Sequence, residues 1–171
     1  MTDNTQDQSQ PQAKAQDERM FQLHRIYIKD LSFESPKSPH IFLGEWQPKH
    51  GLSLNTQVNR IDDVTFEVIL TVTVTTHIGD QTAFIVEVQQ AGLVGVKGFA
   101  EPELGPLLGA YCPNLLFPYA REAISDLVAK GSFPQLVLQP VNFEVLYAQR
   151  QRQMMEEMQK KAGGTPSPTI N

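Results

Sequence analysis

A stretch of alternating apolar and polar residues, Phe66–Gly92, carries the clearest structural signal in the chain. The even-numbered positions from 66 to 74 are all apolar, and the odd-numbered positions are mostly polar. This period of two is typical of a β-strand with one buried face and one wetter face. A second alternating run covers Ala83–Gln90, and Gly79 between the runs suits a tight turn. The pattern predicts a β-hairpin, which needs further strands and a cover to be stable in water.

Two further strands are expected before the hairpin. Phe21–Glu34 alternates weakly and is followed by a segment with two prolines, which remove hydrogen-bond donors and so end a strand. Asp30 and Glu34 share parity in this run, so their carboxylates leave the same face of a regular strand. Leu52–Ile61 also alternates, and the short apolar segment His40–Pro48 precedes it. The pattern therefore predicts four strands.

The rest of the chain is expected to be one loop and two helices. Ala91–Ala110 holds five glycines and two prolines, which predicts a long irregular loop of the kind that is often functional, with a short helical turn around Leu104–Leu108. Phe117–Lys130 has apolar residues at helical spacing, with Pro118 in its first turn. A second helix is predicted over Phe143–Lys161.

Strands that precede helices along the chain indicate an α+β fold. We expect a four-stranded antiparallel sheet with two helices packed on one face, and a second face that is solvated or open to partners. Asn142 is a good N-cap for the last helix. The domain should occupy residues 21–161. Residues 1–20 and 162–171 are expected to be disordered tails, because they hold too few apolar side chains to join a core.

The composition suits one soluble globular domain and excludes several classes of protein. The chain has 171 residues, of which 40% are hydrophobic and 19% are charged. Its apolar runs are too short to span a bilayer, and its N-terminus lacks the apolar region of a secretory signal peptide. The net charge of −5 disfavours nucleic acid as a partner, because phosphates would repel the surface. An acidic surface can attract a basic protein partner, but solubility is the simpler explanation of the charge.

A search for catalytic or metal-binding motifs gives a negative result. The four histidines are scattered, and none has the spacing of a metal-binding pair. Cys112, the only cysteine, has no nearby His or Asp motif, and a chain with one cysteine and no internal disulfide fits a reducing cytosol. The glycine-rich motifs that bind phosphate are missing. We therefore predict no metal, no cofactor and no enzymatic activity.

Apolar side chains in irregular segments point instead to a binding protein. Aromatic and aliphatic residues lie in stretches interrupted by Gly and Pro, and Met154, Met155 and Met158 lie in the last predicted helix. Such side chains can repack around varied apolar ligands. The alternative is that they fill the space between the helices and the sheet, and the pattern alone favours that alternative.

Two segments give the chain a close resemblance to a known family. The motifs AFIVEVQQAG at Ala83–Gly92 and LGAYCPNLLFPYAR at Leu108–Arg121 resemble SecB, the family of protein-export chaperones. RIYIKDLSFESP and GSFPQLVLQPVNF add further matches, so the likeness covers roughly Phe21–Tyr147. The resemblance implies the same sheet and helices that the pattern predicts. It also implies a cytosolic homotetramer, built as a dimer of dimers, that holds unfolded secretory preproteins without ATP and delivers them to the SecA motor.

The resemblance further implies three sets of functional positions. In the family, one surface docks a small zinc-stabilised tail that SecA carries. The positions of that surface match residues on two strands of this chain: Asp30, Glu34, Ile85 and Glu87. Positions tied to oligomer assembly in the family match Val86, Val88 and Gln90. The family's client groove lies between the glycine-rich segment and the long helix, and its matching positions are Trp46, Leu52 and Leu54, with Phe42 and Leu108 as further candidates.

Two other functional classes are alternatives to an export chaperone. A chain of this fold can serve as a dedicated chaperone or adaptor for one client, such as an antitoxin. An enzyme whose site no motif reveals is the third class, although no set of nucleophile and base is visible in the sequence. Direct insertion into a membrane is not expected from the short apolar runs.

Overall fold

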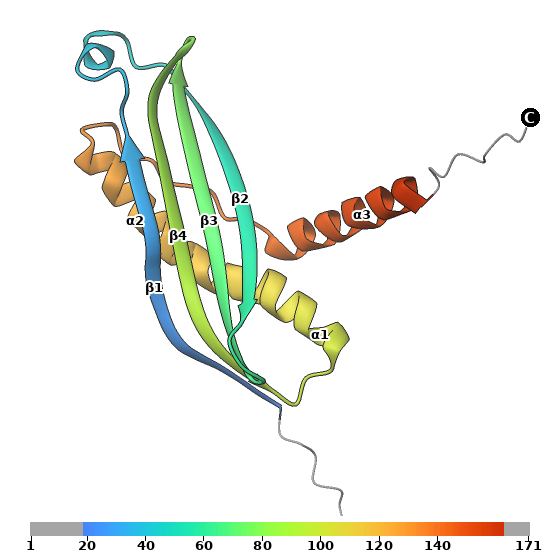
Figure 1. Cartoon of the computed structure of the whole chain (residues 1–171). Coiled ribbons are helices and arrows are strands. Elements are labelled where there is room, and N and C mark those ends of the chain that lie inside the picture. The colour runs from blue at the N-terminus through green and yellow to red at the C-terminus, as the bar shows by residue number, and fades with distance from the viewer. Residues whose placement is uncertain (1–18, 163–171) are drawn as a thin grey trace, which may run out of the picture.

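Four antiparallel strands form one sheet in the computed structural model, which describes residues 19–162 (Figure 1). The strands lie in the order β1-β4-β3-β2. Their bounds are Met20–Glu34 for β1, Pro48–Arg60 for β2, Thr65–Ile78 for β3 and Gln81–Lys97 for β4. The predicted hairpin is confirmed as the central pair β3 and β4, and Gly79 in its turn has a positive φ of 56°. The two other predicted strands form the edges of the sheet.

Helices follow the strands, as the α+β prediction requires. A short 3₁₀-helix, η1, lies between β1 and β2, and a π-helical turn, η2, connects α1 directly to α2. Their bounds are His40–Leu43 for η1, Glu101–Pro106 for α1, Leu107–Tyr111 for η2, Cys112–Lys130 for α2 and Phe143–Ala162 for α3. The predicted tails, residues 1–20 and 162–171, lie outside the described residues except at their inner ends, where β1 already includes Met20.

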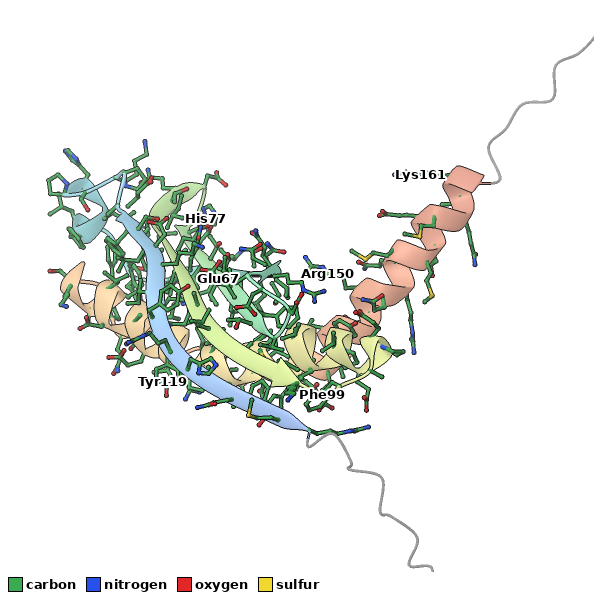
Figure 2. The ribbon with its side chains drawn as sticks, turned by 60° about the horizontal axis from the view of Figure 1, so that its bottom comes forward. Glu67, His77, Phe99, Tyr119, Arg150 and Lys161 are labelled. Carbon is green, nitrogen blue, oxygen red and sulfur yellow. The ribbon has the colours of Figure 1, made fainter. Side chains whose placement is uncertain are left out.

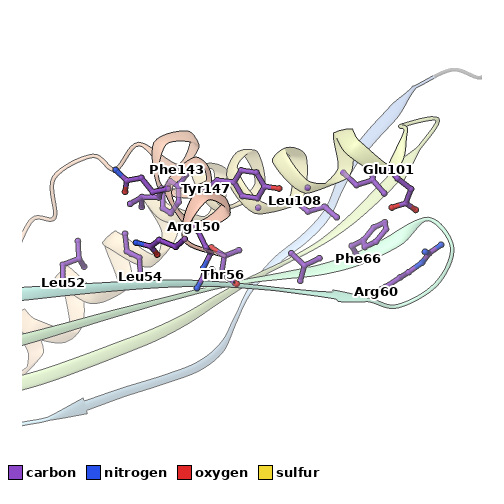
Figure 3. Close-up of a pocket in the computed structure, with 17 residues that line it drawn as sticks. Leu52, Leu54, Thr56, Arg60, Phe66, Glu101, Leu108, Phe143, Tyr147 and Arg150 are labelled. Atoms are coloured by element: carbon purple, nitrogen blue, oxygen red, sulfur yellow. Dashed lines mark hydrogen bonds between the residues drawn. The ribbon is translucent and has the colours of Figure 1, made fainter. Parts of the chain in front are cut away.

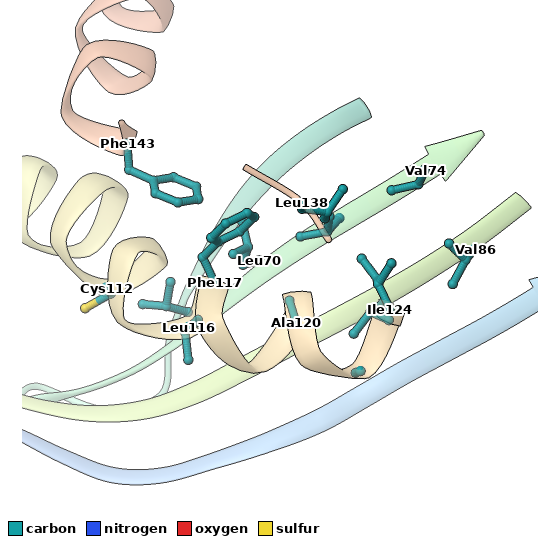
Figure 4. Packing of buried hydrophobic residues seen from close by; sticks show 14 of the residues in the cluster. Leu70, Val74, Val86, Cys112, Leu116, Phe117, Ala120, Ile124, Leu138 and Phe143 are labelled. Atoms are coloured by element: carbon teal, nitrogen blue, oxygen red, sulfur yellow. The ribbon is translucent and has the colours of Figure 1, made fainter. Parts of the chain in front are cut away.

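The sheet has an inner face, which α2 covers, and an outer face on the opposite side (Figure 1). On β3 every even-numbered residue from Phe66 to Thr76 is buried, which confirms the predicted alternation. Val86 and Val88 of β4 are fully buried beside them. Side chains from one face of α2 complete this core: Leu116, Phe117, Ala120, Ile124 and Val128 (Figure 4). The core therefore lies between α2 and the two central strands.

α3 lies on the same side of the sheet as α2, but only its first turns are near the sheet. Phe143 at its start is buried, and its ring packs at an angle of 62° against Phe117 of α2, with 5.6 Å between the ring centroids. Beyond Arg150 the helix projects away from the body of the molecule, as far as Lys161 in Figure 2. The predicted N-cap is confirmed, because the Val145 amide donates to Asn142 Oδ1 at 3.0 Å.

The prediction of an irregular loop over Ala91–Ala110 is wrong. β4 continues to Lys97, and α1 and η2 occupy most of the rest, including the short helical turn that was expected there. The glycines mark close packing within the strand and not flexibility. A Cβ atom at Gly92 would lie 3.1 Å from Leu116 Cδ2 of α2, and one at Gly95 would lie 2.6 Å from His24 Nε2.

The predicted start of the first long helix is also wrong. α2 begins at Cys112, five residues before Phe117, so Pro118 lies inside the helix and not in its first turn. The helix can begin earlier because α1 and η2 lead into it without a break, and Pro113 takes a place in its first turn instead.

We predict that Leu70→Ala lowers the free energy of unfolding by about 2–5 kcal/mol, because Leu70 is fully buried between β3 and α2 and its loss leaves a cavity. Leu43→Ala is the matched control. Leu43 is 85% exposed, so its truncation should change stability by no more than about 0.5 kcal/mol. Urea unfolding of both variants measures the difference, and equal effects would contradict the assignment of the core.

Candidate functional site

An apolar groove of about 850 Å³ opens between β2, the segment from α1 to η2, and the first turns of α3 (Figure 3). Its apolar lining comes from all three sides: Leu52, Leu54, Val58, Phe66, Leu104, Leu108, Phe143, Leu146 and Tyr147. Polar and charged side chains complete the lining: Thr56, Arg60, Glu101, Gln149, Arg150 and Gln153. The groove therefore combines a broad apolar surface with a polar lining.

The groove exists because the inner face of β2 is only partly covered. Leu52 of β2 pairs with Val74 of β3, and Val58 pairs with Val68, so the members of each pair face the same side of the sheet. Val68 and Val74 are fully buried, whereas Leu52 is 46% exposed and Val58 is 41% exposed. The strand thus presents core-like side chains at an edge that the helices leave accessible.

α3 reaches the groove through an unusually close approach of Tyr147 to two glycines. A Cβ atom at Gly105 would lie 2.3 Å from the Tyr147 hydroxyl oxygen, and one at Gly109 would lie 2.6 Å from the Tyr147 ring. Only glycine leaves room for the ring at these positions. Gly109 lies in the π-helical turn η2, and such turns are frequent at functional sites.

Arg150 ties α3 to the edge of the sheet on the other side of the groove. Its Nη2 donates to Asn55 Oδ1 at 2.6 Å, and its Nη1 donates to the carbonyl oxygen of Thr56 at 3.4 Å. Together with Tyr147, this contact holds the second and third turns of α3 beside β2 (Figure 3).

The predicted groove residues fall in two places. Leu52, Leu54 and Leu108 line the groove. Trp46 and Phe42 lie instead in an aromatic cluster with Phe133, at centroid distances of 5.6 and 5.0 Å. Sequence reasoning missed the aliphatic and aromatic lining from the helices: Leu104, Phe143, Leu146 and Tyr147. The helical spacing of the last three was a usable signal, because it places them toward one side of α3.

The four residues matched to the SecA-docking surface lie together on the outer face, and we call them the acidic face. Glu34 of β1 pairs directly with Ile85 of β4. Glu87 pairs with Ser32, and Asp30 pairs with Gln89, so the set occupies alternate positions on two neighbouring strands. Glu87 Oε2 accepts a hydrogen bond of 2.7 Å from the Thr73 hydroxyl. The acidic face and the groove therefore lie on opposite sides of the sheet.

A second polar cluster lies on the outer face around Glu67 of β3. Its carboxylate accepts hydrogen bonds from the Tyr27 hydroxyl, from Lys29 Nζ at 2.7 and 2.8 Å, and from Asn59 Nδ2 at 2.9 Å. These donors, Lys29 first, lower the pKa of Glu67 from its ordinary 4.5 to about 2. The same carboxylate raises the pKa of Tyr27 to about 12. The cluster joins both edge strands to β3.

The assembly positions Val86, Val88 and Gln90 need a correction. All three are buried inside the chain, where the two valines face α2 and the Gln90 amide donates to the Tyr27 carbonyl oxygen at 2.9 Å. Their even numbers place them on the inner face of β4, under the helix. They are not available for direct contact with another chain, so any effect on assembly would act through the packing of α2 and β1.

The described part of the chain was also searched for a reactive cysteine, a metal site and a membrane-spanning helix. Cys112 is buried, and burial raises the pKa of its thiol to about 12, so it is a poor nucleophile. Across residues 19–162, no three His, Cys, Asp or Glu side chains come together as a metal site would require. The helices of this range are each too short or too polar to cross a membrane.

We predict that the stabilising effect of Glu67 depends on pH. Because its pKa is lower in the folded protein than its ordinary 4.5, its contribution is fully present above pH 4.5 and is lost as the pH falls through about 2. Glu67→Gln should therefore be less stable than the wild type at pH 7, and this difference should shrink between pH 4.5 and 2. Urea unfolding at several pH values tests this, and a difference that stays constant with pH would refute it.

Comparisons with known proteins point to one family. Residues 14–154 match the family model described as preprotein translocase subunit SecB. The protein-export protein SecB of Marinobacter nauticus is 54% identical over 142 residues, which cover 83% of this chain and 86% of the relative. That of Pseudomonas paraeruginosa is 49% identical over 170 residues, covering 99% and 96%.

A solved structure supports the fold at lower identity. It is the SecB-like chaperone of Mycobacterium tuberculosis in complex with a peptide from the HigA1 antitoxin. Its TM-score is 0.60 at 19% identity, and the match covers 71% of this chain and 90% of that one. At this identity the likeness bears on the fold alone.

Proposed function

This chain belongs to the SecB family, and on that basis we propose that it is a protein-export chaperone, which binds unfolded preproteins in its apolar groove and releases them for export without consuming ATP. The groove is the observation that carries the proposal. Its lining is broad and apolar, and no set of side chains around it resembles a nucleophile with its base. We further propose that the protein works in the cytoplasm and has no enzymatic activity.

The chemistry of the groove suits an unfolded chain. Unfolded preproteins expose apolar side chains, and each one that is buried gains about 1.5–3 kcal/mol. Leu52 and Val58 are already partly exposed on β2, so they need not leave a packed core to contact a client. Several such contacts give affinity without requiring one particular client sequence. This breadth is what a chaperone for many preproteins needs.

The acidic face suits a second partner. We propose that Asp30, Glu34 and Glu87 contact the basic, zinc-stabilised tail of SecA, with Ile85 as an apolar contact between them. Because this surface is on the outer face and the groove is on the inner face, one partner can bind while the other stays in place. We also propose that the chain forms a homotetramer, a dimer of dimers, as the family resemblance implies.

We predict that the purified protein slows the folding of an unfolded precursor in the absence of nucleotide, and that Leu54→Ala weakens precursor binding at least about fivefold, because it removes apolar surface from the groove. Val137→Ala, which truncates an exposed residue outside the groove, should bind as the wild type does. Light scattering should give four times the 19.2 kDa of one chain. A protein that leaves precursor folding unchanged would refute the chaperone proposal, and a monomer would refute the tetramer.

We predict that Glu87→Lys weakens SecA binding at least tenfold, because it replaces a carboxylate of the acidic face with a cation. The tetramer and precursor binding should be unchanged, because Glu87 lies on the face opposite the groove. Isothermal titration with SecA and with an unfolded precursor measures both affinities. Equal loss of both would show that the two surfaces are not separate.

A dedicated chaperone for one client is the second candidate function. A SecB-like protein of the same fold was solved with an antitoxin peptide, which shows that this fold can hold a peptide from one particular client. Competition between unrelated unfolded proteins separates the two functions. A general export chaperone is competed by most of them, whereas a dedicated chaperone ignores all but its own client.

A further inference from the structure

Lys29 is the neighbour in sequence of Asp30, and it therefore lies at the border of the acidic face. The pairing of β1 with β4 passes over it, because Ile28 pairs with Gln90 and Asp30 pairs with Gln89. Lys29 is thus the extra residue of a β-bulge. Its contact with Glu67 shows that its side chain lies on the outer face, on the same side as Asp30.

A lysine in this place would normally reduce the negative charge of the acidic face. Its ammonium group sits on a long, flexible stem and can turn toward a nearby carboxylate. Pairing with Asp30 would neutralise one of the three carboxylates and would repel a basic ligand at close range. A surface that binds cations therefore has to direct this lysine elsewhere.

The structure directs Lys29 toward Glu67. Lys29 Nζ contacts both carboxylate oxygens of Glu67, at 2.7 and 2.8 Å. Tyr27 and Asn59 donate to the same carboxylate and fix its orientation. The Glu67 side chain is only 10% exposed, so solvent screens the pair less than it screens an exposed pair. Lys29 itself keeps 41% of its side chain exposed, so it is free to turn if this partner is removed.

From this arrangement we infer that Glu67 is a positioning residue for the acidic face. By holding Lys29, it keeps the charges of Asp30, Glu34 and Glu87 available to a basic protein ligand. This inference rests on the proposed docking of SecA, and it assigns to the Glu67 cluster a role in partner binding besides its role in joining the strands.

The test compares the binding of the isolated, zinc-loaded SecA tail to the full-length wild type and to Glu67→Gln. Glutamine has nearly the same shape and still accepts a hydrogen bond, but it has no charge to hold Lys29. We expect the variant to bind the tail about fivefold more weakly at low salt. The difference should shrink as salt rises, because exposed charges are screened.

A second substitution separates positioning from structure. In the double variant Glu67→Gln with Lys29→Met the freed cation is absent, so tail binding should return to within about twofold of the wild type. Glu67→Gln with Lys49→Met is the matched control. Lys49 lies at the start of β2, far along the sheet from Asp30 in strand order, so its removal changes the net charge equally but should not restore binding.

The possible results separate the positioning role of Glu67 from the proposed docking of SecA. If the wild type binds the tail and Glu67→Gln binds it equally well, or if both double variants restore binding equally, the inference is wrong and the docking proposal stands. If the wild type does not bind the tail, the docking proposal fails and the inference fails with it. Should Glu67→Gln not fold, Lys29→Met alone decides: it should bind the tail at least as tightly as the wild type, and weaker binding would overturn the inference.

Discussion

The antiparallel register of the sheet is the constraint on which the rest of the molecule depends. Each residue of a strand can face only one side, and the pairing of β3 with both neighbours fixes which side for every row across the sheet. The rows through Val72 and Val74 reach Leu54 and Leu52 of β2, so apolar residues continue to the edge strand. α2 packs mainly on β4 and β3, and the continuation on β2 is met only by η2 and by Arg150 of α3. The groove is the part of the inner face that the main helix does not cover.

The same alternation explains how one small domain can present two surfaces that do not interfere. Ile85 and Glu87 face outward, while Val86 and Val88 between and beside them face the helix. A change on the outer face therefore alters charge without removing atoms from the core. The exception is Glu67, which is on the outer face and yet buried, and which connects β1, β3 and β2 through its three donors. It is the point at which the charge of the outer face and the integrity of the sheet are coupled.

The strands, the hairpin and the common face of Asp30 and Glu34 could be predicted from the sequence, because each depends on a local period of two. The α+β class could be predicted from the order of strands before helices along the chain. It did not allow the segment from Gly92 to Gly109 to be read correctly. In this segment several glycines make room for a residue that is distant in the sequence: Gly92 for Leu116, and Gly109 for Tyr147. A glycine that permits close packing and a glycine that permits flexibility look the same in one sequence. Trp46 and Phe42 were assigned to the groove by the family resemblance, whereas here both pack against Phe133, a neighbour about 90 residues away that no local pattern reveals.

The desolvation of the Glu67 carboxylate costs free energy, and this cost bears on the role of the cluster. A buried carboxylate must give up its hydration, and well-packed apolar residues of similar volume often stabilise a fold as well as a buried ion pair does. Here Tyr27, Lys29 and Asn59 all donate to the Glu67 carboxylate, so its hydrogen-bonding capacity is met. The pairing of the strands itself does not require a charged residue at position 67. An apolar residue at position 67 would still lie opposite Leu93 of β4 and Asn59 of β2, yet it would leave Lys29 beside Asp30 without its present partner. The ion pair thus adds stability, as the lowered pKa of Glu67 indicates, and in the role proposed above it also keeps Lys29 away from Asp30.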